Sequence, residues 1–276
     1  MSDQFEQLVD LLHGKRWTAL TGAGLSTDSG IPDYRGPDSP PRTPMTFQQF
    51  TSDHGFRRHY WARNHVGWRH MRITRPNEGH RALAALETAG VVTGVITQNV
   101  DRLHQVAGSV NVIDLHGHYN AVICLNCGHR MSRSALHEKL EALNPGFAER
   151  MDVQDVEIAP DADAVIEATA DFQVVDCPVC GGVLKPDIVY FGETVPKERV
   201  ARAYEMVDEG DALVVLGSSL AVMSGLRFVH HAARAGQPIA IVNRGETRGD
   251  RYATVKLDAG TTETLTALLS RLPALL

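Results

Sequence analysis

The chain has 276 residues, of which 43% are hydrophobic and 22% charged, and its formal net charge is -6. This length suits one large α/β domain with an inserted module, and the apolar fraction is enough for a packed core. The negative charge gives no general attraction to nucleic acid or anionic lipid. No secretory or transit signal opens the sequence and no apolar run approaches a membrane span, so we expect a cytoplasmic protein that binds neither nucleic acid nor membrane.

Apolar periodicity divides the chain into alternating helices and strands. Apolar residues at helical spacing mark residues 5–12 and 80–88. Short apolar runs predict strands at 17–20, 91–97, 112–115, 212–219 and 238–243. The alternation predicts an α/β fold with a Rossmann-like parallel sheet and helices on both faces.

Two stretches interrupt this alternation and predict a smaller inserted domain. Residues 40–77 are rich in aromatic residues, Arg and His and are expected to form a helical module, whereas residues 121–184 contain every cysteine. Within the second stretch, residues 151–171 hold seven acids and no Lys or Arg, which favours a solvated loop or polar helix. The Rossmann-like domain is then expected at 1–39, 78–120 and 185–276.

The four cysteines form two C-x-x-C pairs, each followed by Gly, at Cys124, Cys127, Cys177 and Cys180. This spacing lets both sulfurs of a pair reach one tetrahedral ion at about 2.3 Å, and four thiolates leave no open position for water. The sequence therefore predicts one structural Zn2+ and makes 121–184 a zinc-binding module. Two unrelated thiol pairs, a redox dithiol, and a site in which His129 replaces one cysteine are the alternatives.

A Gly-x-Gly turn at Gly22 and Gly24 follows the first predicted strand. Such a turn brings the backbone close to a diphosphate, and the next helix N-terminus adds N–H groups. Thr27 stands where a dehydrogenase fingerprint has its third Gly, and no acid near position 45 is available to bind a ribose. The turn therefore favours a dinucleotide but disfavours ordinary hydride transfer.

Polar loops follow the turn and two of the other predicted strands. They are SGIPDYRG at 29–36, TQNVDRLH at 97–104 and LHG at 115–117. The carboxyl ends of strands are where open α/β sheets bind ligands. With GSS at 217–219, Asn243 and the paired cysteines, these loops closely resemble the sirtuin family of NAD-dependent protein deacylases across most of the chain. Residues 60–68 and 184–193 resemble the sirtuin-4-like (class II) branch.

The resemblance implies an enzyme that consumes NAD and an acyl-lysine protein or peptide and releases nicotinamide and O-acyl-ADP-ribose. It implies that His116 is the general base that accepts a ribose hydroxyl proton, and that Asn99 and Asp101 fix the ribose and the nicotinamide amide. The residues implied to bind NAD are Gly22, Ala23, Gly24, Ser26, Thr27, Ile31, Pro32, Asp33, Tyr34, Arg35, Gln98, Asn99, Val100, Asp101, His116, Gly217, Ser218, Ser219, Asn243, Arg244, Gly245 and Thr261. The alternatives are a mono-ADP-ribosyltransferase on the same NAD site and a non-catalytic NAD-sensing module.

Candidate substrate contacts lie in the inserted stretches and near the C-terminal strands. They are Tyr60, Arg63, Val189, Phe191, Gly192, Glu193, Ser224 and Gly225. Tyr60 and Arg63 share a helix face and suit an acyl carboxylate, as in the desuccinylating branch of the family, while a packing Tyr with a surface Arg is the alternative. Segments 191–193 and 223–225 are expected to flank a peptide that adds as a strand. The long stretch between the cysteine pairs is expected to send a loop toward the acyl channel.

Overall fold

The computed structural model describes residues 3–36, 43–151, 159 and 163–272. It divides into two compact units, the first comprising Met1–Pro41, Arg75–Leu115 and Val195–Leu276 and the second Arg42–Thr74 and His116–Thr194. The two inserted stretches of the sequence thus belong to one unit. Its boundaries lie at 116 and 194, outside the expected 121 and 184, because the strand at 184–188 pairs with the strand at 117–124 rather than with the large sheet.

The first unit contains a six-stranded parallel sheet in the order β3-β2-β1-β7-β8-β9. Its strands are β1 (Trp17–Thr21), β2 (Val92–Thr97), β3 (Val112–Asp114), β7 (Ala212–Leu216), β8 (Ile239–Val242) and β9 (Val255–Leu257). The strands that follow β1, namely β2 and β3, are added on one side of it. Those that follow β7, namely β8 and β9, are added on the opposite side of the sheet. The strand order therefore reverses between β1 and β7, which is where open α/β sheets hold ligands at their carboxyl ends.

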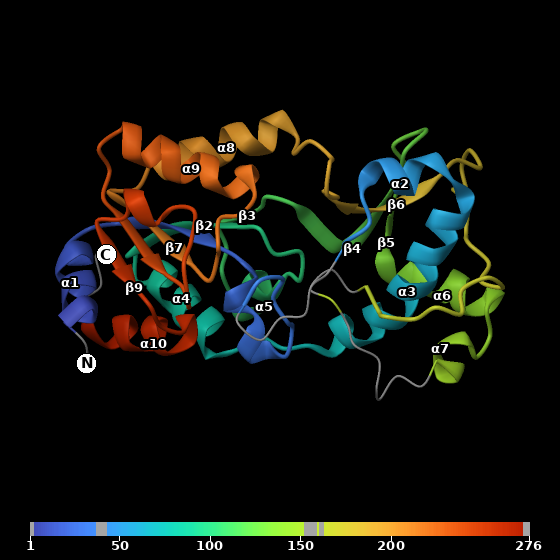
Figure 1. The fold of residues 1–276 in the computed structure, drawn as a ribbon, viewed down its shortest axis with the longest axis horizontal. Coiled ribbons are helices and arrows are strands. Elements are labelled where there is room, and N and C mark those ends of the chain that lie inside the picture. The colour runs from blue at the N-terminus through green and yellow to red at the C-terminus, as the bar shows by residue number, and fades with distance from the viewer. Residues whose placement is uncertain (1–2, 37–42, 152–158, 160–162, 273–276) are drawn as a thin grey trace. The chain divides into compact units, whose positions relative to one another are not determined.

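Helices cover both faces of this sheet, so the predicted Rossmann-like architecture is confirmed. In Figure 1, α8 and α9 lie along one face and α4 and α10 along the other. The helices of the unit are α1 (Asp3–Leu12), α4 (Glu78–Thr88), α5 (Leu103–Ala107), α8 (Lys197–Asp208), α9 (Met223–Arg234) and α10 (Thr261–Arg271). Leu83 of α4 and Leu265 of α10 join Val95 and Val214 of the sheet in one buried apolar core. That core fixes the ends of β1 and β7, between which the Gly-rich turn at 22–26 lies.

The second unit contains a three-stranded antiparallel sheet in the order β5-β4-β6, together with four helices. Its elements are α2 (Phe47–Ser52), α3 (His54–Ile73), β4 (Gly117–Cys124), β5 (Arg130–Ser132), α6 (Arg133–Leu143), α7 (Phe147–Arg150) and β6 (Leu184–Ile188). Gly117 has φ of +75°, and a Cβ there would lie 2.0 Å from the Asp187 carbonyl oxygen. Only glycine allows β4 to approach β6 this closely.

A buried guanidinium joins α3 to α6 in the second unit. Arg133 has no exposed surface, lies 4.9 Å from the Trp68 ring centroid and 5.5 Å from that of Trp61, and donates to Asn64 Oδ1 at 2.9 Å. Burial lowers the pKa of Arg133 to about 10, so the group stays charged at neutral pH. The two tryptophans are therefore core residues that stabilise a buried cation.

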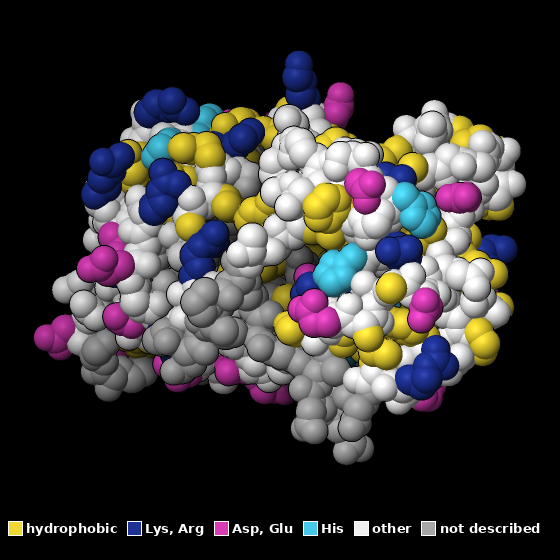
Figure 2. Space-filling view, turned by 45° about the vertical axis from the view of Figure 1, so that its right-hand side comes forward, with side chains coloured by type: hydrophobic (Ala, Val, Ile, Leu, Met, Phe, Trp, Pro, Cys, Tyr) yellow, Lys and Arg dark blue, Asp and Glu magenta, His cyan; other side chains and the backbone are white. Residues whose placement is uncertain are grey.

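Acidic and basic side chains are both present on the face that Figure 2 draws. Among the described helices, none combines the length and the apolar character that a membrane span requires.

Candidate functional site

The Gly-rich turn lies between the carboxyl ends of β1 and β7. Gly22 N donates to Leu216 O at 3.0 Å, and Gly24 N donates to Gly217 O at 2.9 Å. A Cβ on Gly22 would lie 2.7 Å from Gly217 O, and one on Gly24 would lie 3.0 Å from Gly217 Cα. Both glycines are therefore required by close backbone packing at the switch point, in addition to any role at a diphosphate.

Three predicted residues converge on the inside of this turn. Asn99 Nδ2 donates to Gly22 O at 3.0 Å and to Ser26 Oγ at 3.1 Å, and Ser26 Oγ donates to Asp101 Oδ2 at 2.7 Å. Burial raises the pKa of the Asp101 carboxyl, while hydrogen bonds from Leu103 N and Ser26 Oγ oppose that rise. The loop after β2 therefore holds the turn after β1 through a continuous polar network, with Val100 half-buried between its two members.

Gln98 extends the network to the end of β7. Its Nε2 donates to Ser218 Oγ at 2.7 Å, and Ser218 Oγ accepts from Leu220 N at 3.2 Å. A Cβ on Gly225 would lie 2.7 Å from Gln98 Oε1. Gly225 and Ser224, which the sequence places beside a bound peptide, lie in the first turn of α9, where Gly225 lets the helix pass over Gln98.

The residues predicted for the adenosine half of NAD form a separate turn after β8. Asn243 Nδ2 donates to Arg244 O at 2.8 Å, and Gly245 N donates to Asp258 Oδ1 at 3.2 Å. The left-handed φ of Gly245, +78°, makes this turn possible. Thr261, at the start of α10, connects to the Gly-rich turn because its Oγ1 donates to Gly24 O at 3.3 Å. Ser219 lies between the two turns, where its carbonyl accepts from Arg248 N at 3.1 Å.

The segment after the turn is organised by its own acid. Asp33 Oδ1 accepts from Gly36 N at 2.6 Å and from Arg35 N at 3.2 Å. Thr27 Oγ1 donates to Gly24 O at 3.1 Å, and Ile31 is buried with its N–H directed at Ser26 O at 3.3 Å. The first part of the segment is therefore fixed to the turn, whereas Pro32 and Tyr34 lie in the irregular part that follows.

His116 lies in the second unit, immediately before β4, whereas Asn99 and Asp101 belong to the first unit. The His116 carbonyl accepts from Val189 N at 2.7 Å. Val189, a predicted peptide contact, thus uses its N–H to fix the backbone of the predicted base. The imidazole is half-buried.

The other predicted peptide contacts in the second unit are bonded within that unit. Phe191 O accepts from Phe47 N at 2.9 Å, and Gly192 O accepts from Gln48 Nε2 at 3.2 Å. Glu193 Oε2 accepts from Lys185 Nζ at 2.9 Å and from Tyr190 N at 2.9 Å. This segment is therefore held in place by α2 and β6, and Glu193 stabilises a buried lysine.

Tyr60 and Arg63 have different environments on α3. Tyr60 is 2% exposed and packs edge-on against Phe50, with ring centroids 5.4 Å apart. Arg63 Nε lies 2.7 Å from Asp163 Oδ1, and Arg63 Nη1 lies 3.1 Å from His59 Nε2. Asp163, from the stretch between the cysteine pairs, thus forms an ion pair with Arg63. Arg63 is the residue that the sequence analysis assigns to an acyl carboxylate. The neighbouring residues 152–158 and 160–162 lie outside the described part of the chain.

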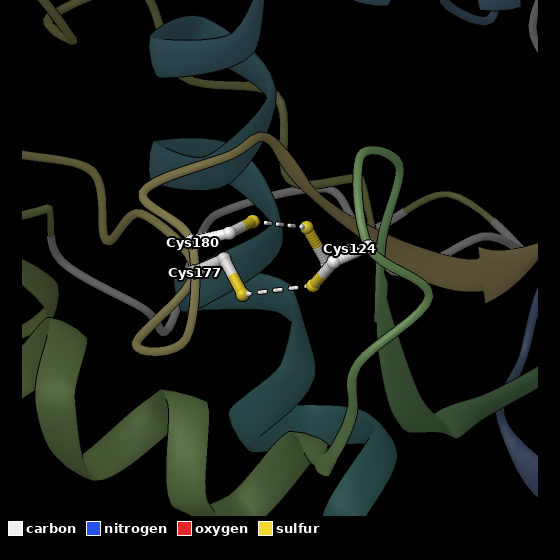
Figure 3. A group of neighbouring side chains, drawn as sticks. Cys124, Cys177 and Cys180 are labelled. Atoms are coloured by element: carbon white, nitrogen blue, oxygen red, sulfur yellow. Dashed lines mark hydrogen bonds between the residues drawn. The ribbon is translucent and has the colours of Figure 1, made fainter.

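The four cysteines meet in the second unit (Figure 3). Their sulfurs all lie within 4.8 Å of one another, with Cys124 Sγ 3.6 Å from Cys180 Sγ and Cys127 Sγ 3.8 Å from Cys177 Sγ. A tetrahedron with Zn–S bonds of about 2.3 Å places its sulfurs about 3.8 Å apart, so the arrangement fits a zinc ion. These contacts are too long for disulfides, and all four cysteines are free.

Local backbone groups prepare one of these sulfurs for a metal. Burial raises the pKa of the Cys124 thiol, but the N–H groups of Cys127 and Asn126 and the neighbouring Cys180 and Cys177 side chains together lower it to about 6. Gly128 and Gly181 follow the two pairs with φ of +72° and +67°, as the predicted tight turns require. His129 has no place among the four clustered ligand groups of the described chain.

One set of buried residues beside the turn escaped sequence analysis. Asn77, His80 and His104 are all buried, and each bonds to another member of the first unit. The only signal in the sequence is Asn77 three residues before His80, which is the spacing of a helix N-cap.

Comparison with known proteins agrees with this geometry. Residues 22–224 match the Sir2 family. The NAD-dependent protein deacetylase 1 of Mycobacterium avium (strain 104) is 66% identical over 270 residues, which are 98% of this chain and 96% of the relative. The protein of the same description from Streptomyces coelicolor is 51% identical over 269 residues, 96% of this chain and 89% of the relative.

Solved structures show the same likeness in three dimensions. A structure described as "Sir2-p53 peptide-NAD+" has a TM-score of 0.70 and 31% identity, and one described as "Structural Basis for the Mechanism and Regulation of Sir2 Enzymes" has a TM-score of 0.75 and 29% identity. Each alignment covers 98% of both chains. The chain belongs to the Sir2, or sirtuin, family.

Proposed function

We propose that the protein is an NAD-dependent protein-lysine deacetylase that transfers the acyl group of its substrate to ADP-ribose. The observation that carries this conclusion is the polar network at the switch point of the sheet, in which Asn99 and Asp101 are bonded to the Gly22–Ser26 turn and Gln98 is bonded to Ser218. Relatives at up to 66% identity described as NAD-dependent protein deacetylases support the same activity.

In this proposal NAD supplies an N-glycosidic bond whose cleavage releases nicotinamide. Gly22, Ala23, Gly24 and Ser26 hold the diphosphate, and Asn99 and Asp101 orient the nicotinamide ribose. Ser218 and the 243–245 turn bind the adenosine half. The acyl-lysine carbonyl oxygen would displace nicotinamide by bonding to the anomeric carbon of the ribose. His116 would then accept a proton from a ribose hydroxyl, whose oxygen attacks the imidate carbon, and addition of water would release the free lysine amine and O-acyl-ADP-ribose.

The zinc ion has a structural role because four thiolates leave it no open position. It would hold the end of β4 and the turn at 124–127 to the turn at 177–180 that precedes β6. A cytoplasmic setting belongs to the proposal, since the thiols bind zinc only when reduced.

The acyl group of the substrate is proposed to be short and uncharged. Arg63 is the cation that would receive an acyl carboxylate, but Asp163 is already 2.7 Å from its Nε. A second carboxylate would have to displace that acid or share a guanidinium with it, and like charges disfavour sharing. Although the resemblance of residues 60–68 and 184–193 to the sirtuin-4-like branch leaves bulkier acyl groups open, the paired Arg63 favours acetyl over succinyl or glutaryl chains.

The products formed from NAD separate this proposal from its alternatives. Parent protein incubated with NAD and an acetyl-lysine peptide is expected to release nicotinamide and deacetylated peptide. His116→Ala is expected to reduce formation of deacetylated peptide by roughly a hundredfold or more, as expected when a general base is lost. His118→Ala, two residues further along β4, is the matched control and should retain most activity. Labelling of protein by ADP-ribose would favour the transferase, and NAD binding without nicotinamide release would favour the sensing module.

A further inference from the structure

Two buried imidazoles lie beside the Gly-rich turn and take no part in the chemistry proposed above. His80 in α4 is 0% exposed and His104 in α5 is 1% exposed. Their ring centroids are 5.0 Å apart with an interplanar angle of 61°, so the rings contact each other edge to face. Histidines are seldom this deeply buried as a pair, because each must remain uncharged there.

Hydrogen bonds join this pair to both ends of the turn. His104 Nε2 lies 2.9 Å from Oγ1 of Thr21, the residue immediately before Gly22. His80 Nδ1 lies 3.0 Å from Asn77 Oδ1, and Asn77 Nδ2 donates to Leu25 O at 2.8 Å. The contacts therefore run from Thr21 through the two rings and Asn77 to Leu25. They connect the two ends of the segment proposed to hold the diphosphate.

The same contacts fix the tautomers of the rings. Asn77 Oδ1 is an acceptor, so His80 carries its proton on Nδ1, and its buried Nε2 has no hydrogen-bond partner. His104 Nδ1 is likewise buried without a partner. A proton on either of these nitrogens would be a buried N–H without an acceptor, so the low-energy arrangement has His104 donate from Nε2 to the Thr21 hydroxyl.

The polar network of Gln98, Asn99 and Asp101 also contacts residues next to the two histidines. Thr21 O accepts from Gln98 N at 2.9 Å, and Asp101 Oδ1 accepts from Leu103 N, the residue before His104. Displacing His104 would thus disturb both Thr21 and the first turn of α5, which Asp101 caps.

We propose that His80 and His104 are positioning residues for NAD, which hold the Gly22–Ser26 turn in its binding conformation through Thr21 and through Asn77 and Leu25. The inference rests on the proposed NAD site. The competing explanation is that the pair only fills the core, in which case its loss lowers stability without changing NAD affinity selectively.

The strand β1 offers a matched pair of variants for the test. Thr21 and Thr18 are both 0% exposed. The Thr18 hydroxyl also has a buried partner, Met206 O at 2.7 Å, but Thr18 lies four residues before Gly22. Thr21→Val and Thr18→Val remove equivalent hydroxyls. His104→Gln keeps an N–H donor near the position of Nε2, whereas His104→Leu removes it.

The measurement is the Kd for NAD by titration calorimetry, together with KM for NAD and for an acetyl-lysine peptide and the Tm of each variant. Thr21→Val and His104→Leu are expected to weaken NAD binding by about fivefold, the effect of one hydrogen bond, and to leave the peptide KM nearly unchanged. His104→Gln should restore most of the affinity. Thr18→Val should lower Tm but leave the Kd for NAD at the parental value.

Equal NAD affinity in Thr21→Val, Thr18→Val and the parent would overturn the inference, as would a His104→Gln protein no better than His104→Leu. If the parent binds NAD but releases no nicotinamide, the proposed reaction fails while the Kd series still decides this inference. A parent with no measurable NAD affinity would overturn both.

Discussion

The Ser26 hydroxyl donates a 2.7 Å hydrogen bond to Oδ2 of Asp101, 75 residues further along the chain. The same oxygen of Ser26 accepts from Asn99 Nδ2, so one small side chain connects the turn after β1 to the loop after β2. The interaction leaves the Asp101 carboxylate with two donors, which offsets part of the cost of its burial. The rigidity of the Gly22–Ser26 turn therefore depends on the two hydrogen bonds of one small side chain, Ser26.

Removing that hydroxyl should weaken both the fold and the NAD site. We expect Ser26→Ala to lower the free energy of unfolding by about 1–3 kcal/mol, because Asp101 and Asn99 each lose a buried partner. NAD affinity should fall in parallel. Ser29→Ala is the control for stability, since the Ser29 Oγ is buried without a hydrogen-bond partner. Chemical denaturation and NAD titration of both variants would contradict this account if Ser29→Ala were the more damaging change.

Loss of one zinc ligand should disrupt the second unit. Cys177→Ser is expected to reduce bound zinc well below one ion per chain and to lower soluble yield, because structural zinc sites contribute directly to folding. His129→Ala should retain one zinc. Metal analysis by mass spectrometry measures both, and a folded, active, zinc-free Cys177→Ser protein would show that zinc has no structural role here.

Acid should destabilise the protein through its buried histidines. Burial lowers the pKa of His80 to about 4, and the Arg81 charge adds to that effect. An unfolded histidine titrates near 6.5, so below that pH the unfolded state binds more protons than the folded state. The stabilisation is fully present above about pH 6.5 and is lost as the pH falls toward 4, by at most about 3 kcal/mol for this group.

Urea unfolding at pH 7 and pH 5 tests this dependence. His80→Asn retains a donor for Asn77 but does not titrate, so its stability should fall less between the two pH values than that of the parent. His13→Asn changes an exposed histidine and should behave as the parent does. A parent equally stable at both pH values would contradict the expected loss.

The Arg63–Asp163 pair predicts a change in acyl selectivity. Replacing Asp163 by Asn frees the guanidinium for a substrate carboxylate, so desuccinylation relative to deacetylation should rise by about tenfold. Asp171→Asn removes an exposed acid of the same stretch and should leave the ratio unchanged. Competition between acetyl- and succinyl-lysine peptides gives the ratio directly, and the same ratio in parent and Asp163→Asn would show that Asp163 does not exclude acidic chains.

Local patterns in the sequence carry much of this architecture. Each of the predicted strands of the parallel sheet is present, because buried central strands need continuous apolar runs that are visible along the chain. The cysteine knuckles are predictable for a similar reason, since ligand spacing within a pair is local. The Gly22–Ser26 turn is also predictable, because its Gly-x-Gly pattern directly follows an apolar strand.

What the sequence conceals depends on contacts between distant segments. The strand β9 has Lys256 at its centre and so presents no continuous apolar run. The strand β6 lies outside the large sheet because it pairs with β4. The burial of Arg133 and His104 contradicts their usual exposure and is decided by aromatic neighbours and by Thr21. Asp163 reaches Arg63 from 100 residues away, so no local pattern predicts their pairing.

The stoichiometry of products tests the central claim most directly. Parent protein, NAD and an acetyl-lysine peptide would be incubated together, and nicotinamide, deacetylated peptide and nucleotide products quantified by mass spectrometry. A deacetylase of the proposed kind yields nicotinamide, free lysine peptide and acetyl-ADP-ribose in equal amounts. Free acetate with intact NAD, or ADP-ribose attached to protein with the peptide still acetylated, would contradict it.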